Sequence, residues 1–298
     1  MWALTTTEFA KLQKRLMTRI LSLLAVVFGL GYPILMIAMI VASDRYGNSK
    51  PTDAQAMETM KDMLLFPGSI AGTFQLLQQP MTIFACIFVG ATVASEFSWG
   101  TVRTVVINAR GRTHFLLAKI LNLLGFSLGW IIVGAVLGLL ATIALTPLAG
   151  RSLQASDFTL HNAGIFLLMI GKLELAVLPY AAVAFLLAIL GRSPIAGIGG
   201  GLAFYLVESY AVTGLSLLGS MKEVLKFTVS RNAGSVLREA SVMHGGGMNE
   251  LLVQSGLGAL VPAYLNQAVS ALLLAAYTAI LLGIALYVFH KRDITVGH

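Results

Sequence analysis

Charged residues are scarce in this sequence. Of its 298 residues only 11% are Asp, Glu, Lys or Arg, whereas soluble domains carry about 25%. Hydrophobic residues make up 57% of the chain. A soluble protein cannot bury that much apolar surface, so the composition excludes a soluble globular domain and predicts an integral membrane protein.

Residues and motifs that carry chemistry are also few. Cys86 is the single cysteine, so it forms no disulfide within the chain. The five histidines and one cysteine show no metal-ligand spacing. The only Gly-Lys pair, Gly171-Lys172, is followed by Leu173, so no phosphate-binding G-x-x-x-x-G-K-[ST] loop is present. We therefore expect no catalysis, metal or cofactor on this chain alone.

Long apolar runs predict an all-α membrane protein with one membrane domain over residues 1–298. About 20 apolar residues cross a bilayer as a helix. Such runs lie at about 20–41, 73–94, 120–145, 175–190, 195–217 and 266–289, which gives six transmembrane helices. Between the last two, helical patterns at 224–229 and 236–240 predict a helical exterior segment.

Residues 5–19 are predicted to form an amphipathic helix that lies in the membrane interface. Thr5 and Glu8 have the spacing of a capping box and so predict the start of this helix. One face is apolar and the other is basic, which is typical of interfacial helices. The apolar face consists of Phe9, Leu12, Leu16 and Ile20, and the basic face consists of Lys11, Lys14 and Arg15. A plain soluble N-terminal helix is the alternative.

Three charges fall inside apolar runs. A charge at mid-bilayer costs at least ~2.5 kcal/mol, so an ionisable residue there is a candidate functional group. Glu208 is the best single candidate, and pairing with a polar group of a neighbouring helix is the alternative. Because Lys172 and Glu174 are both charged, we expect residues 164–174 to form an interfacial or buried segment before the crossing at 175–190. Their placement in a substrate path is the alternative.

Two further patterns concern the inside of the helix bundle. Gln75, Gln78 and Gln79 at the start of the second span predict either a polar path or a cluster that satisfies itself against another helix. Gly197 and Gly201 form a G-x-x-x-G pair, which allows two helix backbones to approach closely.

The distribution of charge predicts the orientation. Lys and Arg gather in the short segments 1–19, 96–119, 191–194 and 290–293, whereas the long loops on the other side carry balanced charge. The positive-inside rule then places both termini in the cytoplasm of a multi-pass plasma-membrane protein. Orientation and contact with anionic membrane lipid account for the net charge of +7, so no nucleic acid is expected as a partner.

The stretch 96–119, EFSWGTVRTVVINARGRTHFLLAK, is the only sizeable basic segment between two long apolar ones. Its first half fits a short amphipathic helix, because Val102, Val105 and Val106 share one helical face. An ordinary positively charged loop is one interpretation. A helix that docks on a soluble partner is the other.

The order of residues in this stretch resembles the ABC type 2 permeases. Their pattern E-x-x-x-G-T-[LIV]-[RE], followed by S/G-R and K, is matched by Glu96, Gly100, Thr101, Val102, Arg103, Arg112 and Lys119. One departure is that Ala109 and Arg110 stand where the family often has proline.

The resemblance implies the membrane subunit of a bacterial or archaeal ATP-driven exporter. It implies coupling to a separate ATPase, which would hold ATP and Mg, through Glu96, Gly100, Thr101, Arg103 and Arg112. It also implies a second permease, as a homodimer or a related heterodimer, and a drug, peptide, lipid or similar amphipathic substrate. The alternative is an ATP-independent transporter or channel that uses intramembrane charges such as Glu208.

Overall fold

The computed structural model describes residues 2–46, 61, 65–98, 112–154, 157–216, 221–238 and 263–291. Within these ranges the chain is helical and contains no strand. The elements are α1 (Trp2–Lys14), α2 (Leu16–Tyr46), α4 (Ser69–Ser98), α6 (Arg112–Leu145), the 3-10 helix η1 (Thr146–Ala149), α7 (Leu160–Gly191), α8 (Pro194–Ser216), α9 (Lys222–Leu225), α10 (Val229–Val236) and α12 (Gln267–Lys291).

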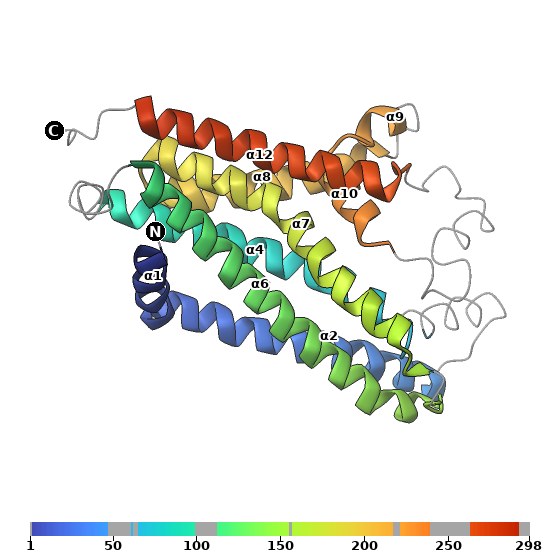
Figure 1. Ribbon diagram of the computed structural model, residues 1–298. Coiled ribbons are helices and arrows are strands. Elements are labelled where there is room, and N and C mark those ends of the chain that lie inside the picture. The colour runs from blue at the N-terminus through green and yellow to red at the C-terminus, as the bar shows by residue number, and fades with distance from the viewer. Residues whose placement is uncertain are drawn as a thin grey trace.

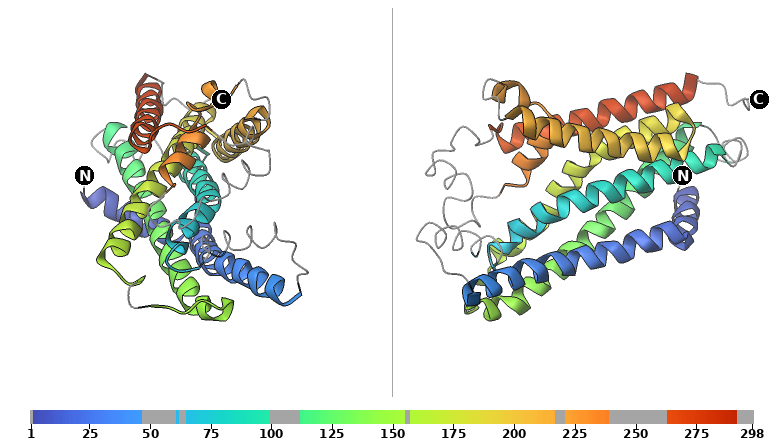
Figure 2. Two further views of the ribbon diagram at one scale, coloured as in Figure 1. Left: turned by 90° about the vertical axis from the view of Figure 1, so that its right-hand side faces the viewer. Right: turned by 180° about the vertical axis from the view of Figure 1, so that it is seen from behind.

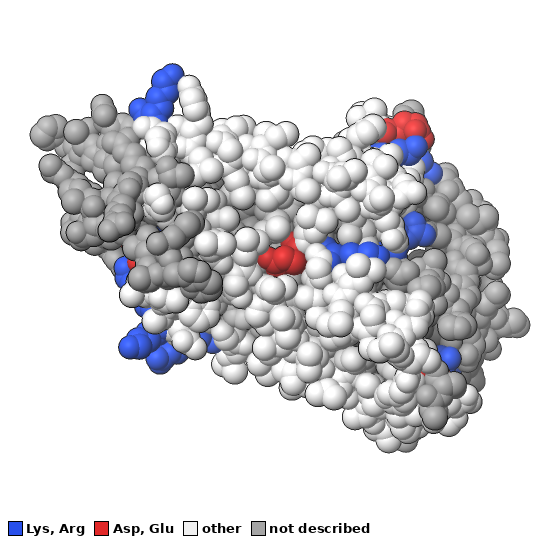
Figure 3. Space-filling model, viewed as in Figure 1, with Lys and Arg blue, Asp and Glu red and all other residues white. Residues whose placement is uncertain are grey.

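Six of these helices are long and apolar enough to cross a membrane: α2, α4, α6, α7, α8 and α12. The protein is therefore a multi-pass membrane protein, and the predicted all-α class with six spans is confirmed at this level. Figure 3 shows charged side chains gathered toward the two ends of the molecule. The band between them is almost uncharged on that face, with one small acidic and one small basic patch.

Helices α4 and α7 form the centre of the bundle. About two thirds of the most apolar window of each is buried, 67% and 61%, against 22% for α8 and α12. Helices α2 and α6 lie along one edge and α8 and α12 along the other (Figures 1 and 2). The core between them is aromatic and aliphatic, with Phe74, Phe88, Tyr180 and Phe185 fully buried. In lipid, close van der Waals packing holds such a core together. The hydrophobic effect contributes little, because the lipid tails are as apolar as the side chains.

Small residues allow α8 to approach the centre closely. A Cβ atom on Gly197 would lie 2.7 Å from Gly90 Cα of α4, and a Cβ atom on Gly201 would lie 2.6 Å from Ala184 Cβ of α7. No side chain fits at either separation. The G-x-x-x-G pair therefore lies at a helix contact within this chain.

Helix α7 differs from the sequence-based expectation, because residues 164–174 do not form a separate segment. They continue without a break into one helix of 32 residues. The two charges inside it have polar partners on neighbouring helices. Lys172 Nζ donates to Gln267 Oε1 at 3.3 Å, and Ser127 Oγ donates to Glu174 Oε1 at 2.6 Å. These contacts lower the cost of keeping both residues on the helix.

The N-terminal helix begins earlier than predicted. Helix α1 already includes Trp2, so Thr5 lies inside it and the predicted capping box is wrong. Figure 1 shows α1 running across the direction of α2 at the end of the bundle where α12 also ends. Phe9 stacks on Phe126 of α6 with ring centroids 4.6 Å apart, which fastens α1 to the bundle.

Helix α10 packs against α7, α8 and α12 at the opposite end of the bundle. Helices α9 and α10 lie at 222–225 and 229–236, whereas the sequence predicted helices at 224–229 and 236–240, of which residues 239–240 lie outside the described residues. The difference arises at Asn232, whose buried side-chain amide donates to the carbonyls of Lys226 and Thr228 at 2.9 and 2.7 Å. This bridge fixes the turn between the two short helices.

Candidate functional site

A buried ion cluster joins α1, α4 and α6. Lys119, in the second turn of α6, places its Nζ 2.8 Å from Glu8 Oε2 of α1 and 3.0 Å from Glu96 Oε1 of α4. The side chains of Lys119 and Glu96 are 2% and 0% exposed. Lys11, half exposed, adds weaker contacts of 3.4 Å to Glu96 and 3.6 Å to Glu8.

Among the described contacts of this cluster, two carboxylates face two ammonium groups. Buried ion pairs add little net stability compared with a hydrophobic core, but removing one partner costs about 3–5 kcal/mol because a buried charge is left uncompensated. Lys119 is the member that contacts both acids closely. Arg15 adds a second link at this end, since its guanidinium donates to Ser95 Oγ of α4 at 3.1 Å. The ends of α1, α4 and α6 are thus held together.

The cluster flanks the basic stretch 96–119. Residues 99–111 lie outside the described residues, and with them Gly100, Thr101, Arg103 and the predicted docking helix. Arg112 begins α6. Glu96 is fully buried against Lys119, so it holds the two ends of the stretch together and does not present its carboxylate on the surface.

Two members of this cluster do not stand out in the sequence. The spacing of Glu8 from Thr5 is typical of a helix cap, and Lys119 is one residue of a longer pattern. A signal existed in the sequence: Lys119 follows four apolar residues and precedes a long apolar run, so its ammonium group needs an acidic partner near the membrane. Nothing in the sequence indicates that this partner is 111 residues away on α1.

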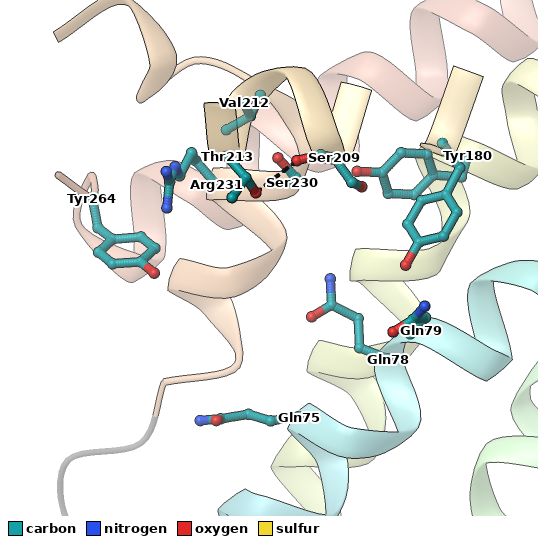
Figure 4. Close-up of a pocket in the computed structure, with 11 residues that line it drawn as sticks. Gln75, Gln78, Gln79, Tyr180, Ser209, Val212, Thr213, Ser230, Arg231 and Tyr264 are labelled. Atoms are coloured by element: carbon teal, nitrogen blue, oxygen red, sulfur yellow. Dashed lines mark hydrogen bonds between the residues drawn. The ribbon is translucent and has the colours of Figure 1, made fainter. Parts of the chain in front are cut away.

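A second candidate site is a polar cavity of about 310 Å³ between α4, α8 and α10. Figure 4 shows the glutamines of α4 on one side and residues of α8 and α10 on the other. The cavity brings the glutamines of the predicted polar cluster together with tyrosines and an arginine that do not stand out in the sequence. Its lining consists of Gln75, Gln78, Gln79, Tyr180, Tyr205, Ser209, Val212, Thr213, Ser230, Arg231 and Tyr264.

Glu208 lies behind the lining of this cavity, and each of its carboxylate oxygens accepts a hydrogen bond from a residue of that lining. The hydroxyl group of Tyr180 donates to Oε2 at 2.8 Å, and the backbone N–H of Ser230 donates to Oε1 at 2.9 Å. Glu208 therefore ties α8 to α7 and to α10. This geometry fits the interpretation that it pairs with polar groups of its neighbours.

The other polar groups of the cavity are less completely paired. Gln75 Nε2 donates to the carbonyl of Leu237 at 3.4 Å. The side chains of Gln78 and Gln79 make no hydrogen bond to another described residue, and both are accessible from the cavity. Arg231 lies 5.9 Å from the ring centre of Tyr264 and has no acidic partner among the described residues. These groups can therefore bind water or a ligand in the cavity.

An apolar groove of about 500 Å³ lies on the other side of Glu208, between α7, α8 and α12. Phe204 and Ile280 in its lining are 38% and 58% exposed, so the groove opens on the outer surface of the bundle. Its few polar groups are already paired: Tyr277 donates to the carbonyl of Phe227, and Thr228 donates to that of Leu225. The lining consists of Pro179, Val183, Phe204, Glu208, Phe227, Thr228, Val229, Tyr277, Ile280 and Leu281.

Lys172 and Glu174 do not join the lining of this cavity or of the groove. Glu174 Oε2 is buried without a hydrogen-bond partner among the described residues. Its partner Ser127 lies in the string Gly125-Phe126-Ser127-Leu128-Gly129, which matches the esterase pattern G-x-S-x-G. That pattern positions a nucleophile only on a strand-to-helix turn. Here it lies inside the continuous helix α6, so it carries no such chemistry.

The described residues contain no group of three or more His, Cys, Asp or Glu placed to hold a metal ion.

The chain belongs to the family described as "Protein of unknown function (DUF2705)", whose model matches residues 35–295. No curated protein matches the sequence.

Proposed function

We propose that this member of the DUF2705 family is the permease subunit of an ATP-driven exporter of the ABC type. In this proposal a separate ATPase subunit binds and hydrolyses Mg-ATP, and the stretch 96–119 receives its movement. Two permease subunits, identical or related, would form the unit in the plasma membrane with all termini in the cytoplasm. The proposal rests on the buried cluster. In it Glu96 and Lys119, the first and last residues of that stretch, meet each other, and Lys119 also contacts Glu8 of α1.

The cluster gives the stretch the mechanical attachment that coupling requires. Glu96 lies three residues before the undescribed residues 99–111, and Lys119 lies two helical turns after the start of α6. Both are held by Glu8 and Lys11 of α1. A push on the stretch would therefore move α1, α4 and α6 together, whereas a loose tether would absorb it.

Helix α4 connects this attachment to the polar cavity. Gln78 in the cavity and Glu96 in the cluster are 18 positions apart on one continuous helix, which is about 27 Å at 1.5 Å per residue. A tilt of α4 driven from the cluster would change the width of the cavity at the far end. This linkage supports a role of the cavity in the substrate path.

Gly100→Leu tests this coupling. The substitution blocks a close approach or bend at Gly100, so we expect the ATPase subunit to copurify as before while export is lost. Arg103→Ala should show the same effect more weakly, and Ser241→Ala in the long loop between the last two spans serves as the control. If both Gly100→Leu and Arg103→Ala exported at the unmodified rate, the stretch would not transmit movement.

A transporter or channel that works without ATP is a second candidate function. It is favoured by Glu174, whose Oε2 is buried in a membrane-spanning helix without a partner among the described residues, as expected for a group that carries a proton. Proteoliposomes that contain this chain alone would then move protons or ions, and Glu174→Gln would abolish the flux. The permease proposal predicts no flux in the absence of an ATPase subunit and ATP.

A further inference from the structure

We propose that the polar cavity and the apolar groove together bind one amphiphile with an anionic, phosphate-containing head and a single hydrocarbon chain. The head would lie in the cavity beside Arg231, and the chain would lie in the groove between α7, α8 and α12. As the identity of a transported substrate, this inference rests on the proposed exporter function. As a statement about binding, it rests on the two hollows alone.

The charged and polar groups of the cavity favour an anionic head group. Arg231 is the only charged residue in the described lining, and no carboxylate lines the cavity. Around it stand amide, hydroxyl and phenol groups that donate hydrogen bonds, and Gln78 and Gln79 have donors that no described residue uses. A guanidinium group with neutral donors around it is the arrangement that recognises phosphate. A cationic head would meet the positive charge of Arg231 and is disfavoured.

The groove favours the hydrocarbon chain of the ligand. Every polar side chain in its lining is satisfied by the protein: Glu208 accepts two hydrogen bonds, and Thr228 and Tyr277 each donate to a carbonyl. No polar group of the lining is left to bind a head, so the groove favours hydrocarbon. Its volume of about 500 Å³ lies within the range of about 300–1,000 Å³ that small-molecule sites span. The exposed rings of Phe204 and Phe227 place its mouth at the lipid-facing surface.

The two hollows are neighbours that lie on either side of one wall. Tyr180 and Ser230 line the cavity, Glu208 lines the groove, and the three are joined by hydrogen bonds of 2.8 and 2.9 Å. The negative charge of Glu208 lies on the groove side, and the positive charge of Arg231 lies on the cavity side. An anionic amphiphile would therefore be oriented with its head away from Glu208 and its chain beside it.

The experiment measures binding of palmitoyl-lysophosphatidylglycerol to the purified full chain in a neutral detergent, by native mass spectrometry. We expect saturable binding of one molecule per chain, at least tenfold tighter than binding of palmitoyl-glycerol or palmitoyl-lysophosphatidylcholine. Glycerol 3-phosphate, which has the head without the chain, should compete only weakly. Equal binding of all three lipids, or full competition by glycerol 3-phosphate, would overturn the proposal.

Matched variants assign the binding to these residues. Arg231→Gln should weaken binding about tenfold, and Arg231→Lys should recover most of the loss. Arg238→Gln is the control, because Arg238 also lies over the Tyr264 ring, at 4.6 Å, but does not line the cavity. Val183→Trp fills the groove and should abolish binding, whereas Val207→Trp, on an exposed face of α8 outside the groove, should not. If Arg238→Gln or Val207→Trp weakened binding as much as its partner, the binding would be non-specific.

The two proposals fail separately. Binding is measured on the chain alone, so the lipid can fail to bind while the ATPase subunit still copurifies. Conversely, specific binding without any ATPase partner would leave the site assignment in place and remove the exporter.

Discussion

Lys119→Met removes the central cation of the buried cluster without removing its hydrophobic volume. Lys119 is 2% exposed and contacts both Glu8 and Glu96 within 3.0 Å. The two carboxylate oxygens lie no more than about 6 Å apart because both contact one nitrogen, and at that distance like charges repel. After the substitution, half-exposed Lys11 is the cation that remains beside them among the described contacts, at 3.4 and 3.6 Å.

The expected loss follows from the burial of these groups. Removing one partner of a buried ion pair costs about 3–5 kcal/mol, whereas an exposed pair contributes about 0–1 kcal/mol. We therefore expect Lys119→Met to lower the free energy of unfolding by about 3–5 kcal/mol and Lys11→Met by less than about 1 kcal/mol. Lys119→Met should also weaken the attachment of α1, because Glu8 then loses its closest partner.

The assay is reversible unfolding in mixed micelles, with circular dichroism recorded as the fraction of denaturing detergent rises. A double-mutant cycle of Glu96→Gln and Lys119→Met should give a coupling energy of about 2 kcal/mol, within the range of about 0.5–3 kcal/mol for residues in contact. Equal losses for Lys119→Met and Lys11→Met, or a coupling energy near zero, would refute the assignment of a buried, mutually dependent cluster.

Three further predictions concern topology, packing and the cavity wall. In a Cys86→Ser background, an impermeant thiol reagent on intact cells should label Ser241→Cys and Asn249→Cys and spare Ser98→Cys and Thr113→Cys; the reverse pattern would invert the orientation. Gly197→Val should prevent folding or lower the yield of folded protein because Gly90 leaves no room, whereas Gly199→Val, with nothing within 4 Å, should be tolerated. Glu208→Leu should lower the free energy of unfolding by about 1–3 kcal/mol because it strands two donors, and Glu208→Gln by less, since it keeps an acceptor.

Much of the fold was predictable because the bilayer imposes strong constraints. Six long apolar runs predicted six helices, since a helix is the one structure that satisfies its own backbone polar groups in lipid. Residues 164–174 were expected to form a segment before the crossing, but they belong to one continuous helix with it. The cost of the two charges depends on partners that sequence spacing does not reveal. Gln267 and Ser127 supply those partners from other helices.

The candidate sites were predictable only in part, for a similar reason. The glutamines and Glu208 were singled out because polar residues stand out against an apolar run. Tyr180 was not, because an aromatic ring does not stand out inside an apolar run. Arg231 and Tyr264 were not, because arginine and tyrosine are ordinary in the segment between the last two spans. Their contribution arises from the packing of α10 against α7 and α8, which brings together residues far apart in the chain. Glu8 and Lys119 belong to the same class, since their contact joins residues 111 positions apart.

The proposed exporter depends on a separate ATPase subunit. Affinity purification of the tagged chain from native membranes in a neutral detergent, followed by measurement of ATP hydrolysis in the eluate, tests this directly. We expect a second chain with a G-x-x-x-x-G-K-[ST] loop to elute in a fixed ratio and the complex to hydrolyse ATP. Elution of this chain alone without ATP hydrolysis, or saturable ATP binding by the isolated chain, would contradict it.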